Sequence, residues 1–244
     1  MIARVFVPEA SASGERRLVP ADDAGHLVRV LRLGAGAEVR VFDGRGHEWD
    51  ATIIETTRHD VTVEIGAARV AAPETRIRYT LAVAVLKGDG TDDVVRDAVM
   101  LGVDAIRPCL SARTEVRAAA LERGQRAERW RRIAVASAKQ CGRAVVPVVH
   151  DVADVRTVFA EDVTATRVLL VEPSVRADAA RLAVAPAPAA ITLAVGPEGG
   201  WSGEEVAAAT AAGWQAVTLG GRVLRAERAP VVALAACQAV WSDW

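Results

Sequence analysis

The chain has 244 residues, of which 51% are hydrophobic and 25% charged, and its formal net charge of −1 argues against a uniformly basic nucleic-acid-binding protein. No run approaches the roughly 18 apolar residues of a membrane helix, and the N-terminus lacks the order of a signal peptide, so we expect a cytoplasmic protein that does not enter a membrane. The three cysteines and four histidines lie outside CxxC and HExxH spacings, which predicts neither a disulfide framework nor a bound metal.

The first 70 or so residues predict a small β-rich domain. Patterns typical of short strands occur at 3–7, 37–44, 47–55 and 61–66, and the sequence DGRG between the second and third is typical of a hairpin turn. A stretch with Pro and Ala, residues 68–76, then separates this region from one with a different sequence pattern. We therefore predict two domains, residues 1–72 and 73–244.

From residue 78 onward, apolar runs rich in β-branched residues alternate with helical patterns. Strand-like runs at 79–86 and 104–110 are separated by amphipathic stretches such as 91–102. After a connector rich in Pro and Ala at 185–190, the order strand, glycine-bearing loop and helix occurs twice in the last 54 residues. This alternation is expected of a parallel sheet covered by helices, so the predicted fold class is α/β.

A basic segment lies in the second region. Residues 107–143 hold ten Arg or Lys against three Glu, a local net charge of +7. Such a segment fits contacts to RNA phosphates, but a solvated helix rich in arginine has the same composition. Both interpretations stay open at this point.

The loop that follows the strand at 191–195 is rich in glycine. In open α/β sheets ligands bind beyond the carboxyl ends of strands, and the glycines of residues 196–200 remove side chains where a ligand must approach the backbone. Ser202 and Glu205 have the spacing of a capping box, which predicts a helix start facing this loop. Glu198 disfavours a phosphate and favours a ligand with positive charge, such as the sulfonium and amino group of S-adenosylmethionine. Glycines that only reverse the chain would show the same pattern.

A second loop, LGGRVLRAERAP at 219–230, follows the next strand. Two glycines and two apolar residues suit the wall of an adenine site, and the three charged residues after them suit a polar reacting substrate. Pro230 is placed for the first turn of a helix. A surface turn with ion pairs would show the same residues.

The sequences of these two loops are GPEGGWSGEE (196–205) and LGGRVLRAERAP (219–230). Together they resemble the paired signature of the RsmE-type 16S ribosomal RNA (uracil-N3)-methyltransferases, which belong to the SPOUT class. Blocks at 26–46, 87–114 and 128–143 resemble the same family in the same order, so the resemblance covers nearly the whole chain. It implies that S-adenosylmethionine is the cofactor and that the N3 of a uridine in 16S rRNA of the small ribosomal subunit is methylated. It also implies a PUA-like RNA-binding domain, an α/β SPOUT domain with a trefoil knot, and a homodimer.

The resemblance also implies roles for individual residues. Arg225 and Glu227 lie where the family has its charged catalytic loop. The residues implied for cofactor binding are Val171, Glu172, Gly196, Pro197, Glu198, Gly199, Gly200, Leu219, Gly220, Val223 and Leu224. We expect RNA contacts, chiefly to phosphates, from Arg4, His26, Arg29, Arg32, Lys87, Arg129, Arg132 and Arg143.

The chain departs from the family pattern at several positions. Gly221, Ala226 and Arg228 stand where proline and two threonines are common, and Gly90 and Met100 stand where a basic and an acidic residue are usual. The missing hydroxyls remove hydrogen-bonding groups near the uracil. Three alternatives stay open: a SPOUT-class methyltransferase acting on tRNA or another rRNA position, a non-catalytic RNA-binding ribosome-assembly protein with a degenerate cofactor fold, and a nucleotide-phosphate-binding enzyme, which the acidic loop disfavours.

Overall fold

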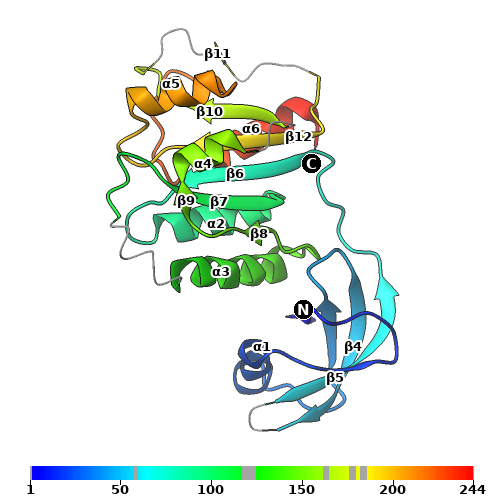
Figure 1. Cartoon of the computed structure of the whole chain (residues 1–244). Helices are drawn as coiled ribbons and strands as arrows, with labels where there is room; N and C mark the ends of the chain where they lie inside the picture. Colours follow the sequence, from blue (N-terminus) through cyan, green and yellow to red (C-terminus); the bar gives the residue numbers. More distant parts are fainter. Residues whose placement is uncertain are drawn as a thin grey trace. The chain divides into compact units, whose positions relative to one another are not determined.

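The computed structural model describes residues 2–57, 60–116, 125–161, 165–175, 180–181 and 186–243. The chain divides into two compact units, Met1–Glu74 with Val135–Val146, and Thr75–Ala134 with Pro147–Trp244. Figure 1 labels several elements of each unit. Arg117 and Arg123 of the predicted basic segment lie outside the described residues.

The first unit is built on a sheet that, within the described residues, has five strands in the order β1-β3-β4-β5-β2. β1 pairs in parallel with β3, and the other pairs are antiparallel. The β-rich character predicted for this region is confirmed. The short helix α1 continues directly as the π-helical turn η1. The elements are β1 (Ala3–Phe6), β2 (Arg16–Leu18), α1 (Ala21–Gly25), η1 (His26–Val30), β3 (Glu38–Phe42), β4 (Glu48–Thr56) and β5 (Val61–Arg69).

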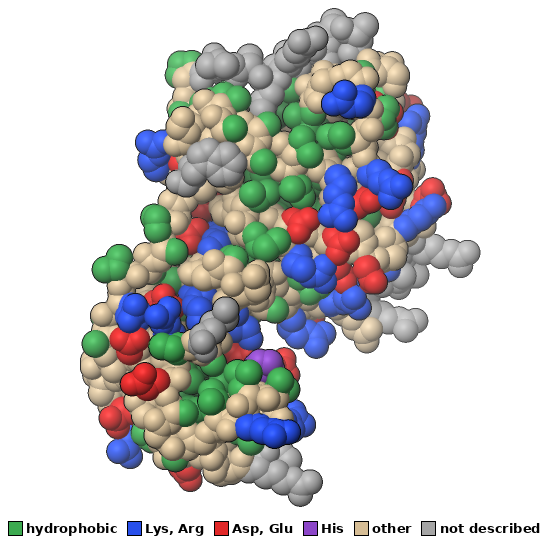
Figure 2. Space-filling view, turned by 180° about the vertical axis from the view of Figure 1, so that it is seen from behind, with side chains coloured by type: hydrophobic (Ala, Val, Ile, Leu, Met, Phe, Trp, Pro, Cys, Tyr) green, Lys and Arg blue, Asp and Glu red, His purple; other side chains and the backbone are tan. Residues whose placement is uncertain are grey.

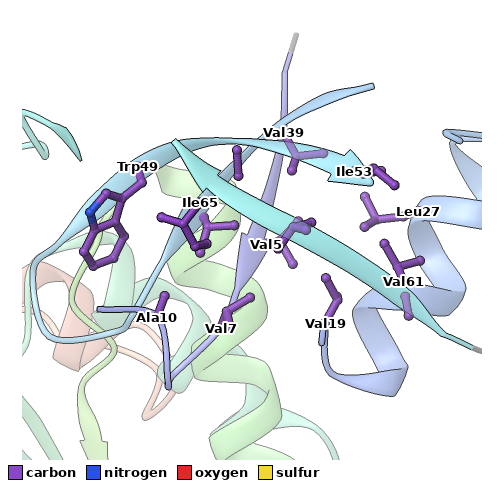
Figure 3. Close-up of a cluster of buried hydrophobic side chains, with 14 residues drawn as sticks. Val5, Val7, Ala10, Val19, Leu27, Val39, Trp49, Ile53, Val61 and Ile65 are labelled. Atoms are coloured by element: carbon purple, nitrogen blue, oxygen red, sulfur yellow. The ribbon is translucent and has the colours of Figure 1, made fainter. Parts of the chain in front are cut away.

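The core of this unit follows from the two-residue period of its strands. In β5, Val61, Val63 and Ile65 are buried on one face, because alternate side chains of a strand point the same way. Figure 3 shows Val61 and Ile65 beside side chains from other elements, among them Leu27 of η1. The predicted hairpin turn between β3 and β4 is confirmed: the Asp43 carboxylate accepts hydrogen bonds from backbone amides within the turn.

The end of helix α3 (Gln125–Cys141) also belongs to the first unit. Arg4 donates hydrogen bonds to carbonyl oxygens at and just beyond this helix end, and its guanidinium pairs with Glu48 at 2.9 Å. A cation placed there satisfies carbonyls that have no partner within the helix. Arg143 is buried and pairs with Glu74. Both guanidiniums hold this unit together, so Arg4 and Arg143 would contact RNA, as expected from the sequence, only by giving up these partners.

The second unit contains a parallel sheet, which confirms the α/β class. Its described strands have the order β11-β13-β10-β12-β6-β7-β8, with β9 beside β7. The strands are β6 (Arg78–Ala84), β7 (Ala105–Leu110), β8 (Val148–Val149), β9 (Ala153–Asp154), β10 (Thr166–Leu170), β11 (Ala180–Arg181), β12 (Ala190–Val195) and β13 (Gln215–Thr218). The remaining helices are α2 (Gly90–Met100), α4 (Val155–Ala160), α5 (Gly203–Ala211) and α6 (Ala229–Trp241).

Helices cover both faces of this sheet. α4 packs against α5 and α2 packs against α6, and Figure 1 shows the first pair in front of the strands and the second pair behind them. Central strands buried on both faces carry nearly continuous apolar runs, as β12 does in AITLAV. Among the described residues, no helix has the length and apolar character needed to cross a membrane.

Candidate active site

Three neighbouring strands of the second unit, β13, β10 and β12, lead into loops that border a cavity of about 450 Å³. Parallel neighbours end at the same edge of a sheet, so their following loops converge there. The volume is in the range of small-ligand sites, roughly 300–1,000 Å³. The lining residues are Leu170, Val171, Glu172, Pro173, Val175, Val195, Gly196, Pro197, Glu198, Gly200, Trp201, Leu219, Arg222, Val223, Leu224, Arg225, Ala226, Glu227 and Ala229.

The structure brings the predicted site residues together. Every residue expected to bind the cofactor lines the cavity except Gly199 and Gly220, and Arg225 and Glu227 line it as well. Trp201 and Arg222 were not predicted, although both stand inside the two loops singled out in the sequence. The glycines and charged residues beside them identified these loops as candidate ligand sites. The local sequence did not indicate that the side chains of Trp201 and Arg222 face the cavity.

The glycines of the first loop are required by its geometry. A Cβ on Gly196 would lie 3.2 Å from the ring of Trp201, and Gly200 has φ +66°. The Gly200 amide donates to the Pro197 carbonyl at 2.9 Å, which closes a tight turn. Trp201 is buried and its Nε1 donates to the carbonyl of Leu170 at 3.0 Å, so it ties this loop to the end of β10. Larger residues would displace the backbone that borders the cavity.

Helix α5 starts directly after this loop with the predicted capping box, which is confirmed. Ser202 Oγ accepts from the Glu205 amide at 3.2 Å, and the Glu205 carboxylate accepts from the Ser202 amide at 2.8 Å. The second carboxylate oxygen of Glu205 accepts from the Ala112 amide at 2.7 Å. The buried Glu205 thus fixes the helix start and holds the loop after β7 beside it.

The second loop turns sharply and is anchored at its end. Gly220 has φ +105°, a conformation that favours glycine. The Arg225 carbonyl accepts from the amide of Arg228 at 2.9 Å, and Pro230 lies in the first turn of α6, as predicted. Arg228, one of the departures from the family pattern, pairs with Asp97 of α2 at 3.3 Å. This departure therefore fastens the loop to a neighbouring helix.

Charges around the cavity are unequal. Three carboxylates line it, those of Glu172, Glu198 and Glu227, against the guanidiniums of Arg222 and Arg225. Arg225 lies 4.0 Å from Glu227, and its side chain is 86% exposed against 25% for that of Glu227. Arg222 has no ion pair among the described residues. A cavity with one excess negative charge favours a ligand with positive charge.

Two of the three cysteines are buried. Burial raises the pKa of Cys109 to about 12 and that of Cys237 to about 12, so neither thiol is a nucleophile near neutral pH. The described part of the chain holds no group of three or more His, Cys, Asp or Glu side chains that could bind a metal ion.

The residues of the second unit that are expected to contact RNA differ in whether their charges are already paired within the chain. The Arg129 guanidinium pairs with Asp92 and with Asp89, so its charge is held by carboxylates of and beside α2. Lys87 pairs with Glu115, and this hydrogen bond raises the pKa of the Lys87 amine. Arg132 is exposed and has no partner among the described residues. In the first unit, the side chains of His26, Arg29 and Arg32 are exposed.

Comparisons with known proteins identify two domains and a family. Residues 73–238 match the model of the RNA methyltransferase domain, and residues 19–66 match that of the RNA methyltransferase PUA domain. The chain is 35% identical over 219 residues to the ribosomal RNA small subunit methyltransferase E of Synechocystis sp., covering 88% of this chain and 70% of that protein.

Two solved structures are similar along their whole length. The crystal structure of ribosomal RNA small subunit methyltransferase E from Neisseria gonorrhoeae bound to S-adenosyl methionine has a TM-score of 0.89 at 34% identity, covering 99% of this chain and 98% of that chain. A Legionella pneumophila protein in complex with the same cofactor has a TM-score of 0.92 at 27% identity, with coverage of 99% and 98%. The chain therefore belongs to the ribosomal RNA small subunit methyltransferase E family, with an RNA methyltransferase domain preceded by a PUA domain.

Proposed function

We propose that this protein transfers a methyl group from S-adenosylmethionine to the N3 of a uridine in the 16S rRNA of the small ribosomal subunit. The observation that carries the proposal is the negatively charged cavity at the ends of β13, β10 and β12, built from the two loops that resemble the uracil-N3-methyltransferase signature. Family relatives named for the small ribosomal subunit RNA support the substrate class.

The cavity fits S-adenosylmethionine in size, polarity and charge. Apolar side chains such as Val223 and Leu224 line one part, next to backbone exposed by the glycine loop, and three carboxylates suit a sulfonium and an ammonium group. When bound, this cofactor supplies an electrophilic methyl group. The residues that would hold it are the predicted ones that line the cavity. Gly199 and Gly220 would act by shaping their loops.

Arg225 and Glu227 are the proposed catalytic pair. Uracil N3 carries a proton that must leave before the nitrogen attacks a methyl group, and the negative charge then spreads onto the ring oxygens. The guanidinium of Arg225 would bind such an oxygen. Glu227, 4.0 Å away, would orient that guanidinium or take up the proton.

RNA binding is assigned to both domains, residues 1–72 and 73–244. The exposed side chains of His26, Arg29, Arg32 and Arg132 would contact phosphates, which position an RNA without reading its sequence. Lys87 would join them only by giving up its pair with Glu115.

A homodimer, a cytoplasmic location and a trefoil knot in the last segment complete the proposal. Met100 of α2 and Val232 of α6 are exposed, although these two helices pack together. Figure 2, viewed from behind, has hydrophobic side chains across the middle of the C-terminal unit, the side on which α2 and α6 lie in Figure 1. A second copy of the chain would cover apolar surface of this kind. Light scattering measures the molar mass in solution: we expect a dimer for the wild type and a monomer for Val232→Glu.

The test of the reaction is methyl transfer from labelled S-adenosylmethionine to purified small subunits that lack native uridine methylation, followed by nucleoside analysis. We expect 3-methyluridine in the rRNA. Transfer to tRNA or to another position would support a different target within the class. Cofactor binding without transfer to any RNA would contradict the proposal and favour a non-catalytic RNA-binding protein.

A further inference from the structure

A segment of the first unit, residues 26–32, turns apolar side chains outward. Leu27 of η1 is buried and points into the core with Val61 (Figure 3). In a regular α-helix, positions three and four residues later share the face of Leu27 and would be buried with it. Val30 is instead 65% exposed and Leu31 42% exposed.

The cause is the π-helical turn. The Leu31 amide donates to the His26 carbonyl at 3.1 Å, five residues back, so the wider turn carries Val30 away from the face of Leu27. Leu31 is exposed at the end of this turn, where the chain leaves the helix. Arg32 then adopts φ +55°, a left-handed conformation that a residue with a side chain rarely adopts. π turns and strained backbone are frequent at functional sites, where the surrounding structure maintains them.

The charges of this segment are not neutralised within the described residues. Arg29 and Arg32 are exposed and have no carboxylate partner there; the Nε of Arg29 donates only to the Gly25 carbonyl. Several other arginines of the unit do have such partners, as Arg16 has in Glu64. Two exposed cations beside two exposed apolar side chains therefore present a surface that complements an anionic partner with apolar faces.

We propose that residues 26–32 form an RNA-contact surface in which Val30 and Leu31 pack against unstacked bases or riboses while Arg29 and Arg32 bind the adjacent phosphates. This inference rests on the proposed function for its ligand, and adds to it a contact that is not electrostatic. Locally unpaired RNA fits because its bases expose their faces, whereas a paired helix buries them. The segment holds no Phe, Tyr or Trp, so the packing of Val30 and Leu31 is aliphatic and follows shape rather than base identity.

The two kinds of contact respond differently to salt. Phosphate contacts release counterions, so each one steepens the fall of affinity with salt, whereas an apolar contact does not. We would measure the dissociation constant of the full chain for unmethylated small subunits across a salt series. Val30→Ser with Leu31→Ser is expected to weaken binding roughly tenfold at every salt concentration. Arg29→Gln with Arg32→Gln is expected to reduce the salt slope by about 1.4 to 1.8.

Val70→Ser is the matched control, because Val70 is 98% exposed in the same unit and lies outside the segment. It is expected to bind like the wild type. Thermal unfolding of all variants distinguishes a lost RNA contact from a loss of folding. The milder variant Val30→Thr serves the same purpose. Wild-type affinity of the Val30 and Leu31 double variant would overturn the inference, and so would a change in self-association without a change in RNA affinity. Binding without 3-methyluridine formation by the wild type would instead count against the proposed reaction.

Discussion

The Glu198 carboxylate accepts a hydrogen bond from the backbone amide of Lys87 at 3.0 Å, which joins the loop after β12 to the loop after β6. A second contact supports the same loop, because Arg113, in the loop after β7, donates to the carbonyl of Gly199 at 2.8 Å. The glycine-rich loop is thus held by the loops that follow β6 and β7. Such preorganisation lowers the cost of ordering the site on binding.

Glu198→Gln separates the charge of this residue from its structural bond. Glutamine keeps an acceptor for the Lys87 amide but removes a negative charge from the cavity lining. We expect affinity for S-adenosylmethionine to fall about fivefold, because a sulfonium would lose a favourable Coulomb interaction. Affinity for S-adenosylhomocysteine, which has a neutral thioether, should change less than about twofold. Calorimetry with both ligands measures this, and equal losses would contradict it. Glu204→Gln, on the exposed start of α5, is the control.

Arg225→Ala is expected to reduce methyl transfer about 100-fold or more while the dissociation constant of the cofactor changes little. The guanidinium is exposed at the cavity, where it would meet the base rather than the cofactor. The methyl-transfer rate of Arg225→Lys should lie between those of the wild type and Arg225→Ala, since lysine keeps the charge but lacks the planar guanidinium. Single-turnover rates and calorimetry check both variants. Arg156→Gln removes an exposed charge of α4 outside the cavity lining and should behave like the wild type; undiminished turnover in Arg225→Ala would remove this residue from the mechanism.

Glu205→Ala tests the join between α5 and the loop after β7. The change removes acceptors for the amides of Ser202 and Ala112, and we expect it to lower the free energy of unfolding by about 2 kcal/mol. Ser202→Ala removes only the side-chain acceptor that caps α5 and should lower the free energy of unfolding by about 1 kcal/mol. Urea unfolding measures both. Glu204→Ala, one position earlier and exposed, should change stability by less than about 0.5 kcal/mol, and an equal effect of all three would contradict this account.

Asp243 should make stability depend on pH. Its carboxylate is buried, which alone would raise its pKa, but hydrogen bonds from the amides of Ile77 and Arg76 and from the Arg76 side chain outweigh burial and lower that pKa. The stabilisation is therefore present above the unfolded value of about 3.9 and is lost as pH falls through the lower folded pKa.

We expect Asp243→Asn to be about 1 to 2 kcal/mol less stable than the wild type at pH 7, with the difference shrinking below about pH 4. Urea unfolding across pH measures it. Asp151→Asn removes a surface carboxylate that pairs with Arg131 and should have little effect at either pH. A difference that persists unchanged at low pH would assign the effect to packing.

Local patterns in the sequence were enough to predict much of the fold and the cavity. Two-residue alternation predicted the first sheet, and apolar runs between helical patterns predicted the parallel one. The capping box at Ser202 and the helix start at Pro230 were also predicted, because both depend on neighbours within a few residues. The loops that border the cavity were found for the same reason: glycine content and strand position are local properties.

Pairings between distant residues were decided only by the tertiary structure. Arg4 and Arg143, counted as RNA-binding cations, instead meet the end of α3 and Glu74, and Arg129 meets Asp92, 37 residues away. Val30 and Leu31 are exposed at a π turn and its end, which their helical spacing to Leu27 does not reveal. The sequence therefore determined which side chains carry charge and which strands end in glycine-rich loops. The fold decided which charges are paired within the chain, because such pairs join residues that lie far apart in the sequence.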